Sequence, residues 1–149
     1  MATVRVSCRG KKDYSLSVRD GMVVLAKADP TDELQHWIKD LKYSTRVKDA
    51  SGLPSFSLIN KATGLALKHS IGDTLPAQLS PHNPYVLDQS ILWTEYGAGD
   101  GFNAIRMVNN IALNLDAFNE VSGPSHDSTI VGIWKWSGGD NQKWKIDPY

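Results

Sequence analysis

The sequence predicts an all-β protein built from three related units. Apolar and polar residues alternate with period two in many short segments, and turn-forming residues separate these segments. A weak threefold repeat runs along the same segments. Residues 32–37 could form one helical turn, but this is too short to change the class. We therefore expect short strands joined by tight turns and closed on themselves.

The predicted strands follow one another at short intervals. In chain order they are residues 4–8, 14–18, 56–59, 65–67, 77–79, 105–108, 111–115, 130–134 and 143–146. Asp20-Gly21 predicts a tight hairpin, and Gly64 closes a second turn. Asn109-Asn110 is expected to adopt positive φ in a third turn, because asparagine tolerates that conformation.

The three units each end on a tryptophan. Residues 56–60 match residues 105–109, and the region from residue 4 to residue 16 is a fainter copy. Trp37, Trp93 and Trp144 close the copies at spacings near a third of the chain. We interpret these tryptophans as core residues. The repeats predict a single domain over residues 1–149, with units at roughly 3–49, 50–97 and 98–149.

Charge and cysteine content exclude several classes of partner. Lys plus Arg balances Asp plus Glu at 16 each, which argues against nucleic acid and against insertion into a membrane. Cys8 is the only cysteine, so no intramolecular disulfide can form. The start of the chain has no signal-peptide pattern, and no apolar run is long enough for a membrane span. We therefore expect the protein to be located in the cytoplasm and nucleus.

The ordered motifs resemble those of a known family. They are residues 14–21, Gln35-His36-Trp37, and residues 43–49, 56–64, 106–110 and 139–142. Threefold repeats ending in Gln-x-Trp are typical of ricin-B-like lectins, and the longer motifs resemble the Euonymus-lectin-related family of plants. This resemblance covers nearly the whole chain. It implies a single β-trefoil domain that binds glycans, lacks a signal sequence, is nucleocytoplasmic and often acts in stress responses.

The resemblance also implies a sugar site in the third unit. A ricin-type unit offers an Asp, an aromatic residue and an Asn-Gln pair, and Asp116, Trp134, Asn141 and Gln142 match these positions. Asp116 would accept hydrogen bonds from two adjacent hydroxyls, and Trp134 would stack on the C–H face of the sugar. Asn141 would contact a further hydroxyl, whereas Gln142 would brace Asp116 or the turn. The resemblance does not decide between galactosides and mannosides, because related folds accept both.

The first two units depart from the pattern. By sequence alignment, the first has Arg19 at the Asp position, Ala26 at the aromatic position and Leu34 in place of Asn. The second has three serines there, Ser70, Ser80 and Ser90. We therefore predict one competent site. Such a shallow site would bind weakly, and extended glycans, a homodimer or a linked module would supply avidity.

Each site residue also has an alternative structural role. Asp116 could cap a turn, and Asn141 is an ordinary turn residue. Trp136 would share a face with Trp134 if the strand continued through both. If the strand ends at Trp134, Trp136 could lie under the loop or flank the pocket. The sequence leaves these possibilities open.

Enzyme activity, metal and cofactors are not expected. The histidines at positions 36, 69, 82 and 126 lack metal-binding spacing, and Ser125-His126-Asp127 lacks a nucleophile elbow. The Gly-rich segment 97–101 predicts a turn and not a phosphate loop. The alternative to a lectin is a protein-interaction or inhibitor module with a vestigial sugar site. The loop at residues 80–85 could contact its protein partner.

Overall fold

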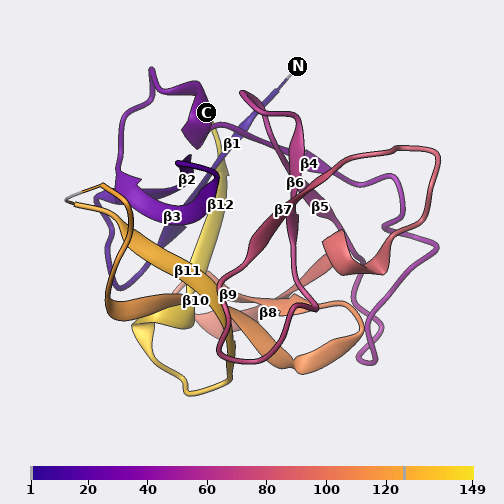
Figure 1. Cartoon of the computed structure of the whole chain (residues 1–149). Helices are drawn as coiled ribbons and strands as arrows, with labels where there is room; N and C mark the ends of the chain where they lie inside the picture. The colour runs from indigo at the N-terminus through magenta and orange to yellow at the C-terminus, as the bar shows by residue number, and fades with distance from the viewer. Residues whose placement is uncertain (1, 126) are drawn as a thin grey trace.

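The computed structural model describes residues 2–125 and 127–149, apart from the side chains of residues 119 and 120, and is all-β (Figure 1). His126, named above among the histidines, lies outside the described residues. The strands are β1 (Val4–Cys8), β2 (Tyr14–Arg19), β3 (Met22–Lys27), β4 (Trp37–Asp40), β5 (Ser57–Asn60), β6 (Leu65–Lys68), β7 (Gln78–Pro81), β8 (Trp93–Gly99), β9 (Phe102–Met107), β10 (Asn110–Ser122), β11 (Thr129–Lys135) and β12 (Trp144–Pro148). Short 3-10 helices η1 (Glu33–Gln35), η2 (Gln89–Ile91) and η3 (Asp140–Gln142) precede β4, β8 and β12.

Six of the strands close into a barrel. Strand β1 pairs with β12 and β4, β12 pairs with β9, β9 with β8, and β4 with β5, all antiparallel. Backbone hydrogen bonds between Phe56 and Trp93 link the start of β5 to β8 and complete the ring. Because the ring is closed, these strands leave no free edge. The first and last strands lie side by side, with Val4 opposite Pro148 (Figure 1).

The other six strands form three hairpins, β2–β3, β6–β7 and β10–β11. Strand β11 also pairs with β3, and Pro76, just before β7, bridges to Gly132 on β11. The hairpins are thereby joined to one another over the barrel. A six-stranded barrel with three such hairpins, four strands to each repeat, is a β-trefoil, which confirms the predicted fold class.

Three buried tryptophans hold the repeats in the same way. Trp37, Trp93 and Trp144 have no exposed surface and belong to one hydrophobic core. Each indole Nε1 donates to a leucine carbonyl on the second strand of its own repeat. The pairs are Trp37 to Leu16 at 2.9 Å, Trp93 to Leu67 at 3.1 Å and Trp144 to Leu115 at 2.9 Å. The predicted core role of these residues is confirmed.

Two of the three predicted turns have the expected backbone. Asp20 and Gly21 have φ of 50° and 74° between β2 and β3, and Gly64 has φ of 70°. The expectation for Asn109-Asn110 was wrong, because neither is among the residues with positive φ. Asn110 pairs with Met107, so Val108 and Asn109 form the turn. A β-branched valine is poorly suited to positive φ, which explains the difference.

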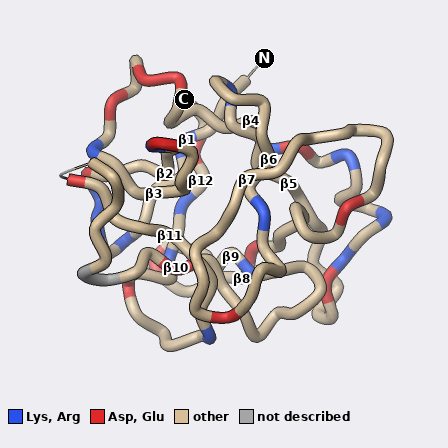
Figure 2. Tube along the Cα trace, in the orientation of Figure 1, with Lys and Arg blue, Asp and Glu red and all other residues tan. Residues whose placement is uncertain are grey.

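Charged residues are distributed along the whole trace, with Lys and Arg interspersed among Asp and Glu (Figure 2). Within the described part of the chain, no helix has the length and apolar character needed to cross a membrane.

Candidate functional site

The outer face of the β10–β11 hairpin carries the predicted site. Leu115 and Ala117 on β10 point into the core. Because side chains alternate along a strand, Asp116 lies on the opposite, outer face. Asp116 is opposite Gly132 on β11, and Trp134 is two residues beyond Gly132. The carboxylate and the indole predicted from the sequence therefore lie on one side of one hairpin.

Asp116 is nearly buried, with 4% of its surface exposed. Its Oδ1 accepts a 3.0 Å hydrogen bond from Asn141 Nδ2, and its Oδ2 accepts a 2.8 Å bond from Gln142 Nε2. Burial raises the pKa of the Asp116 carboxyl, although the two amide hydrogen bonds oppose this shift. An ionised carboxylate has about four acceptor positions, so Asp116 can still accept from a ligand.

Gln142 supports the site from below. Its side chain is completely buried, and Nε2 also donates to Lys135 O at 2.7 Å. Its Oε1 accepts from the backbone N–H of Ser137 at 2.7 Å. Gln142 thus fixes both Asp116 and the turn that follows β11. Both N–H groups of its amide donate within the protein, in keeping with the bracing role expected from the sequence.

Asn141 lies at the cavity wall. Its Nδ2 donates to Asp116 and also to Ala117 O at 3.2 Å. Both amide hydrogens are therefore engaged within the protein. The Oδ1 atom is the part of this side chain that suits an incoming hydroxyl donor.

Trp134 forms a half-exposed wall of the same cavity. Its exposed fraction is 44%, and its ring meets Phe118 edge to face with centroids 5.8 Å apart. Phe118 lies directly over Gly132: a Cβ at that position would be 2.2 Å from Phe118 Cζ and 2.5 Å from Leu75 O. Only glycine leaves room for the ring that supports Trp134.

The cavity has a volume of about 450 Å³. It is lined by Thr74, Asp116, Phe118, Val121, Trp134, Ser137 and Asn141. We call it the Asp116 cavity. Its volume lies in the range of small-molecule sites, about 300–1,000 Å³. The structure brings three of the four predicted residues to its surface and places Gln142 behind them.

The other lining residues were not predicted from the sequence. Phe118 could have been found, because it lies two residues after Asp116 on the same strand face. Thr74 comes from the second repeat, where its backbone N–H donates to Ile133 O at 2.8 Å. No sequence signal predicts that hydrogen bond.

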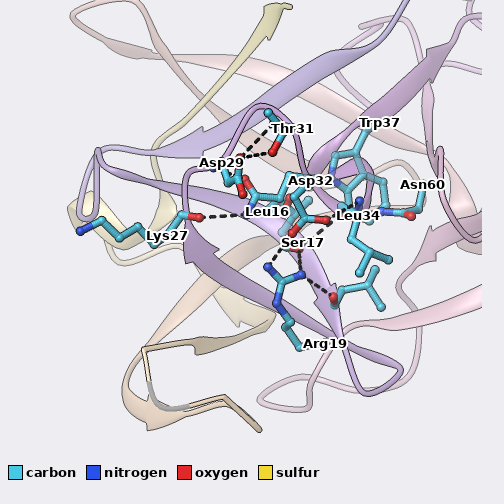
Figure 3. A network of polar contacts seen from close by, with 12 residues as sticks. Leu16, Ser17, Arg19, Lys27, Asp29, Thr31, Asp32, Leu34, Trp37 and Asn60 are labelled. Carbon is cyan, nitrogen blue, oxygen red and sulfur yellow. Dashed lines mark hydrogen bonds and ion pairs between the residues drawn. The ribbon is translucent and has the colours of Figure 1, made fainter.

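The corresponding region of the first repeat is filled by its own side chains. The indole-to-leucine hydrogen bonds align Leu16 with Leu115, so Ser17, and not Arg19, occupies the Asp position. Arg19 lies two residues further on and turns back, donating to Ser17 Oγ at 2.7 Å and to Asp32 Oδ2 at 2.7 Å (Figure 3). Ala26 does occupy the aromatic position.

The second repeat shows the same two-residue displacement. Leu67 aligns with Leu115, so Lys68, and not Ser70, takes the Asp position. Lys68 Nζ donates to Ser90 Oγ at 3.2 Å, and Ser90 Oγ donates to Asp88 at 2.6 Å. A lysine in place of the carboxylate removes the acceptor.

Trp136 follows the end of β11 at Lys135 and is 47% exposed. It therefore does not belong to the core. It lines a different, smaller cavity of about 230 Å³ together with Tyr96 and Arg106.

Among residues 2–125 and 127–149, no group of three His, Cys, Asp or Glu side chains is arranged to hold a metal ion. His69 is buried, and its pKa is lowered to about 4 by that burial. Its Nε2 lies 2.6 Å from Leu92 O, and its ring packs edge to face on Trp93. The contacts of His69 are therefore those of a buried residue packed within the fold.

The sequence is similar to proteins of one kind in two plant species. No protein-family model matches the chain. The chain is 55% identical to ricin B-like lectin R40G3 of Oryza sativa subsp. japonica, over 99% of this chain and 74% of that protein. It is 54% identical to ricin B-like lectin EULS3 of Arabidopsis thaliana, over 99% of this chain but 48% of that protein. It therefore spans about half to three quarters of these relatives.

Solved structures with the same fold include lectins. A ricin B-like lectin of Macrolepiota procera in complex with lactose matches with a TM-score of 0.72 at 15% identity, over 97% of this chain and 94% of that one. The designed threefold-symmetric protein ThreeFoil matches with a TM-score of 0.70 at 20% identity, over 97% of each chain. At these identities the similarity concerns the fold alone.

Proposed function

Because the chain belongs to the ricin B-like lectin family, we propose that it is a non-catalytic carbohydrate-binding protein whose single sugar site is the Asp116 cavity. One observation carries this assignment. A buried carboxylate held by two side-chain amides lies beside a half-exposed indole in one cavity. The equivalent regions of the other two repeats contain an arginine and a lysine and not this combination.

The cavity chemistry matches a neutral sugar. One face of a sugar ring presents C–H groups, which can lie on the Trp134 indole. Its hydroxyls both donate and accept, so two neighbouring hydroxyls can donate to the unused lone pairs of Asp116. Asn141 Oδ1 can accept from a third hydroxyl. A planar ring opposite an acceptor also selects the orientation of the sugar.

Affinity for one sugar residue is expected to be weak. One stacking ring and a few polar contacts correspond to about 4–6 kcal/mol, which is a millimolar to high-micromolar Kd. Extended glycans, a homodimer or a linked module would raise the avidity. A location in the cytoplasm and nucleus and a role in plant stress response remain part of this proposal.

A glycan array that includes galactosides and mannosides tests the proposal. We expect the wild-type chain to bind a subset of glycans and Asp116→Asn to lose that binding. The amide NH2 would replace one carboxylate oxygen, so it would face the N–H donor of Asn141 or Gln142 and remove acceptor positions for the sugar. Asp147→Asn is the matched control, since Asp147 is exposed on β12. Equal glycan binding by the Asp116→Asn and Asp147→Asn variants would contradict the proposal.

A second candidate function rests on a different surface. Tyr85 is 89% exposed in the loop between β7 and η2, and Leu41, Val86 and Leu87 are exposed as well. Such an apolar group of side chains is typical of a protein-interaction surface. A specific partner recovered by pull-down, together with no response to any glycan, would favour an interaction or inhibitor module with a vestigial sugar site.

A further inference from the structure

The smaller cavity at Trp136, which we call the Trp136 cavity, presents two exposed aromatic rings. Trp136 and Tyr96 are 47% and 52% exposed, and both line this volume of about 230 Å³. Ile111 adds an aliphatic side chain to the lining. Concavities lined by aromatic side chains are typical of small-molecule binding sites. The proposed sugar site does not account for them.

The Trp136 cavity and the Asp116 cavity adjoin each other on one face of the hairpin. Asn114 lines the first and Asp116 the second, and they are two residues apart on β10. Residues with this spacing face the same side of a strand and lie about 6–7 Å apart. The loop after β11 repeats the arrangement, since Trp136 lines one cavity and Ser137 lines the other. This separation is close to the length of one sugar residue.

Asn114 fixes the boundary between the cavities. It is 1% exposed, and its Nδ2 lies 3.3 Å from Ala112 O and 3.5 Å from Trp134 O. Its contact with the Trp134 carbonyl ties the end of β11 to β10 between the two cavities. The boundary is therefore formed by the paired strands β10 and β11.

The charge at the Trp136 cavity is already neutralised. The Arg106 guanidinium lies over the Tyr96 ring at 4.4 Å from its centroid. Its Nη2 is 3.2 Å from Asp49 Oδ2, and both side chains are largely buried, with 11% and 0% exposed. An anionic ligand would have to compete with the Asp49 carboxylate for this arginine. A neutral ligand with C–H surface fits the two rings better.

We propose that the Trp136 cavity is a second subsite for a neutral oligosaccharide whose terminal residue occupies the Asp116 cavity. This inference rests on the proposed function. The second sugar residue would lie on the Trp136 ring, with Tyr96 and Ile111 at its edge. The protein would then distinguish an extended glycan from a monosaccharide within one binding face, without a second repeat contributing a full site.

Isothermal titration of matched sugars tests the inference. Galactose is compared with lactose, mannose with mannotriose, and N-acetylgalactosamine with an oligosaccharide that ends in it. We expect wild type to bind the oligosaccharide of at least one pair about 3–10-fold more tightly than its monosaccharide, from one additional stacked ring. Trp136→Ala should remove this gain and leave monosaccharide affinity unchanged. Trp136→Phe should keep most of it, and Tyr85→Ala, a remote exposed aromatic, should change neither affinity.

The outcomes separate this inference from the proposed function. The Trp136 indole N–H signal in NMR spectra of the wild type should shift with the oligosaccharide and not with the monosaccharide. An unchanged affinity ratio in Trp136→Ala, with an unmoved Trp136 signal, overturns the second subsite and leaves the lectin function standing. Failure of wild type to bind any of these sugars contradicts the proposed function and the inference together.

Discussion

Replacing Trp134 by alanine removes the stacking surface and leaves the polar groups of the cavity in place. The ring is 44% exposed, and a tryptophan side chain has about 250 Å² of surface, so about 110 Å² is available to a ligand. At about 25 cal/mol per Å², complete coverage of this surface would contribute about 2.7 kcal/mol. A sugar covers only part of it, so we expect a loss of about 2 kcal/mol, or about 30-fold in Kd.

Titration calorimetry and the glycan array measure this loss directly. A site with millimolar affinity would fall below detection in the variant. The fold should survive, because the three core tryptophans are untouched. Within the protein the substitution removes the edge-to-face pair with Phe118, worth about 0.5–1.5 kcal/mol, together with the packing of the part of the ring that the protein covers. The loss of the Phe118 pair alone corresponds to a decrease of about 1–6 °C in Tm for a chain of this size, and the lost packing of the ring adds to it. Binding by folded Trp134→Ala equal to that of wild type would refute the site assignment.

Three further predictions concern other parts of the same framework. Burial raises the pKa of the Asp116 carboxyl and binding needs the carboxylate, so glycan affinity should fall on acidification with a midpoint above the ordinary pKa of an aspartate side chain. Titrations from about pH 8 to about pH 3 measure this midpoint, and a midpoint below the ordinary aspartate pKa would contradict this role. Gly132→Ala should lower the free energy of unfolding by about 1–3 kcal/mol, because the added Cβ would overlap the Phe118 ring. Urea unfolding measures this loss, and an unchanged midpoint would show that the Phe118 ring moves aside freely. Trp144→Phe should lower the free energy of unfolding by about 1–3 kcal/mol or more, because it leaves the buried Leu115 carbonyl without its hydrogen-bond donor. Thermal unfolding tests this expectation, and a variant as stable as wild type would contradict the proposed role of the indole hydrogen bond.

Much of the third-repeat geometry could be predicted because it is local. Asp116 and Trp134 belong to one hairpin, and Gln142 and Asn141 lie in the turn that follows it. The period-two pattern fixes which face each strand residue occupies. The recurring tryptophans likewise indicated one core position for each repeat. The resemblance to ricin-type units supplied the identity of the four site residues, and this pattern within one repeat explains why they could be assigned to one site.

The two alignment errors, at Arg19 and Ser70, have a common physical origin. A strand pattern with period two looks the same after a shift of two residues, so Arg19 was aligned where the structure has Ser17. Only the hydrogen bond from a tryptophan to a particular leucine carbonyl resolves that shift. The contribution of Thr74 was missed for a different reason, because it depends on pairing between repeats that are distant in sequence. The location of the protein stays a prediction.

The most direct test of the sugar site is an NMR titration of the wild-type chain with the glycans that it binds on an array. We predict that the Trp134 indole signal and the side-chain amide signals of Asn141 and Gln142 shift together in proportion to one-site binding. The remote indole of Trp37, buried in the core, should stay unchanged as an internal reference. Shifts confined to another repeat, or no shift with any glycan, would contradict the assignment of the Asp116 cavity.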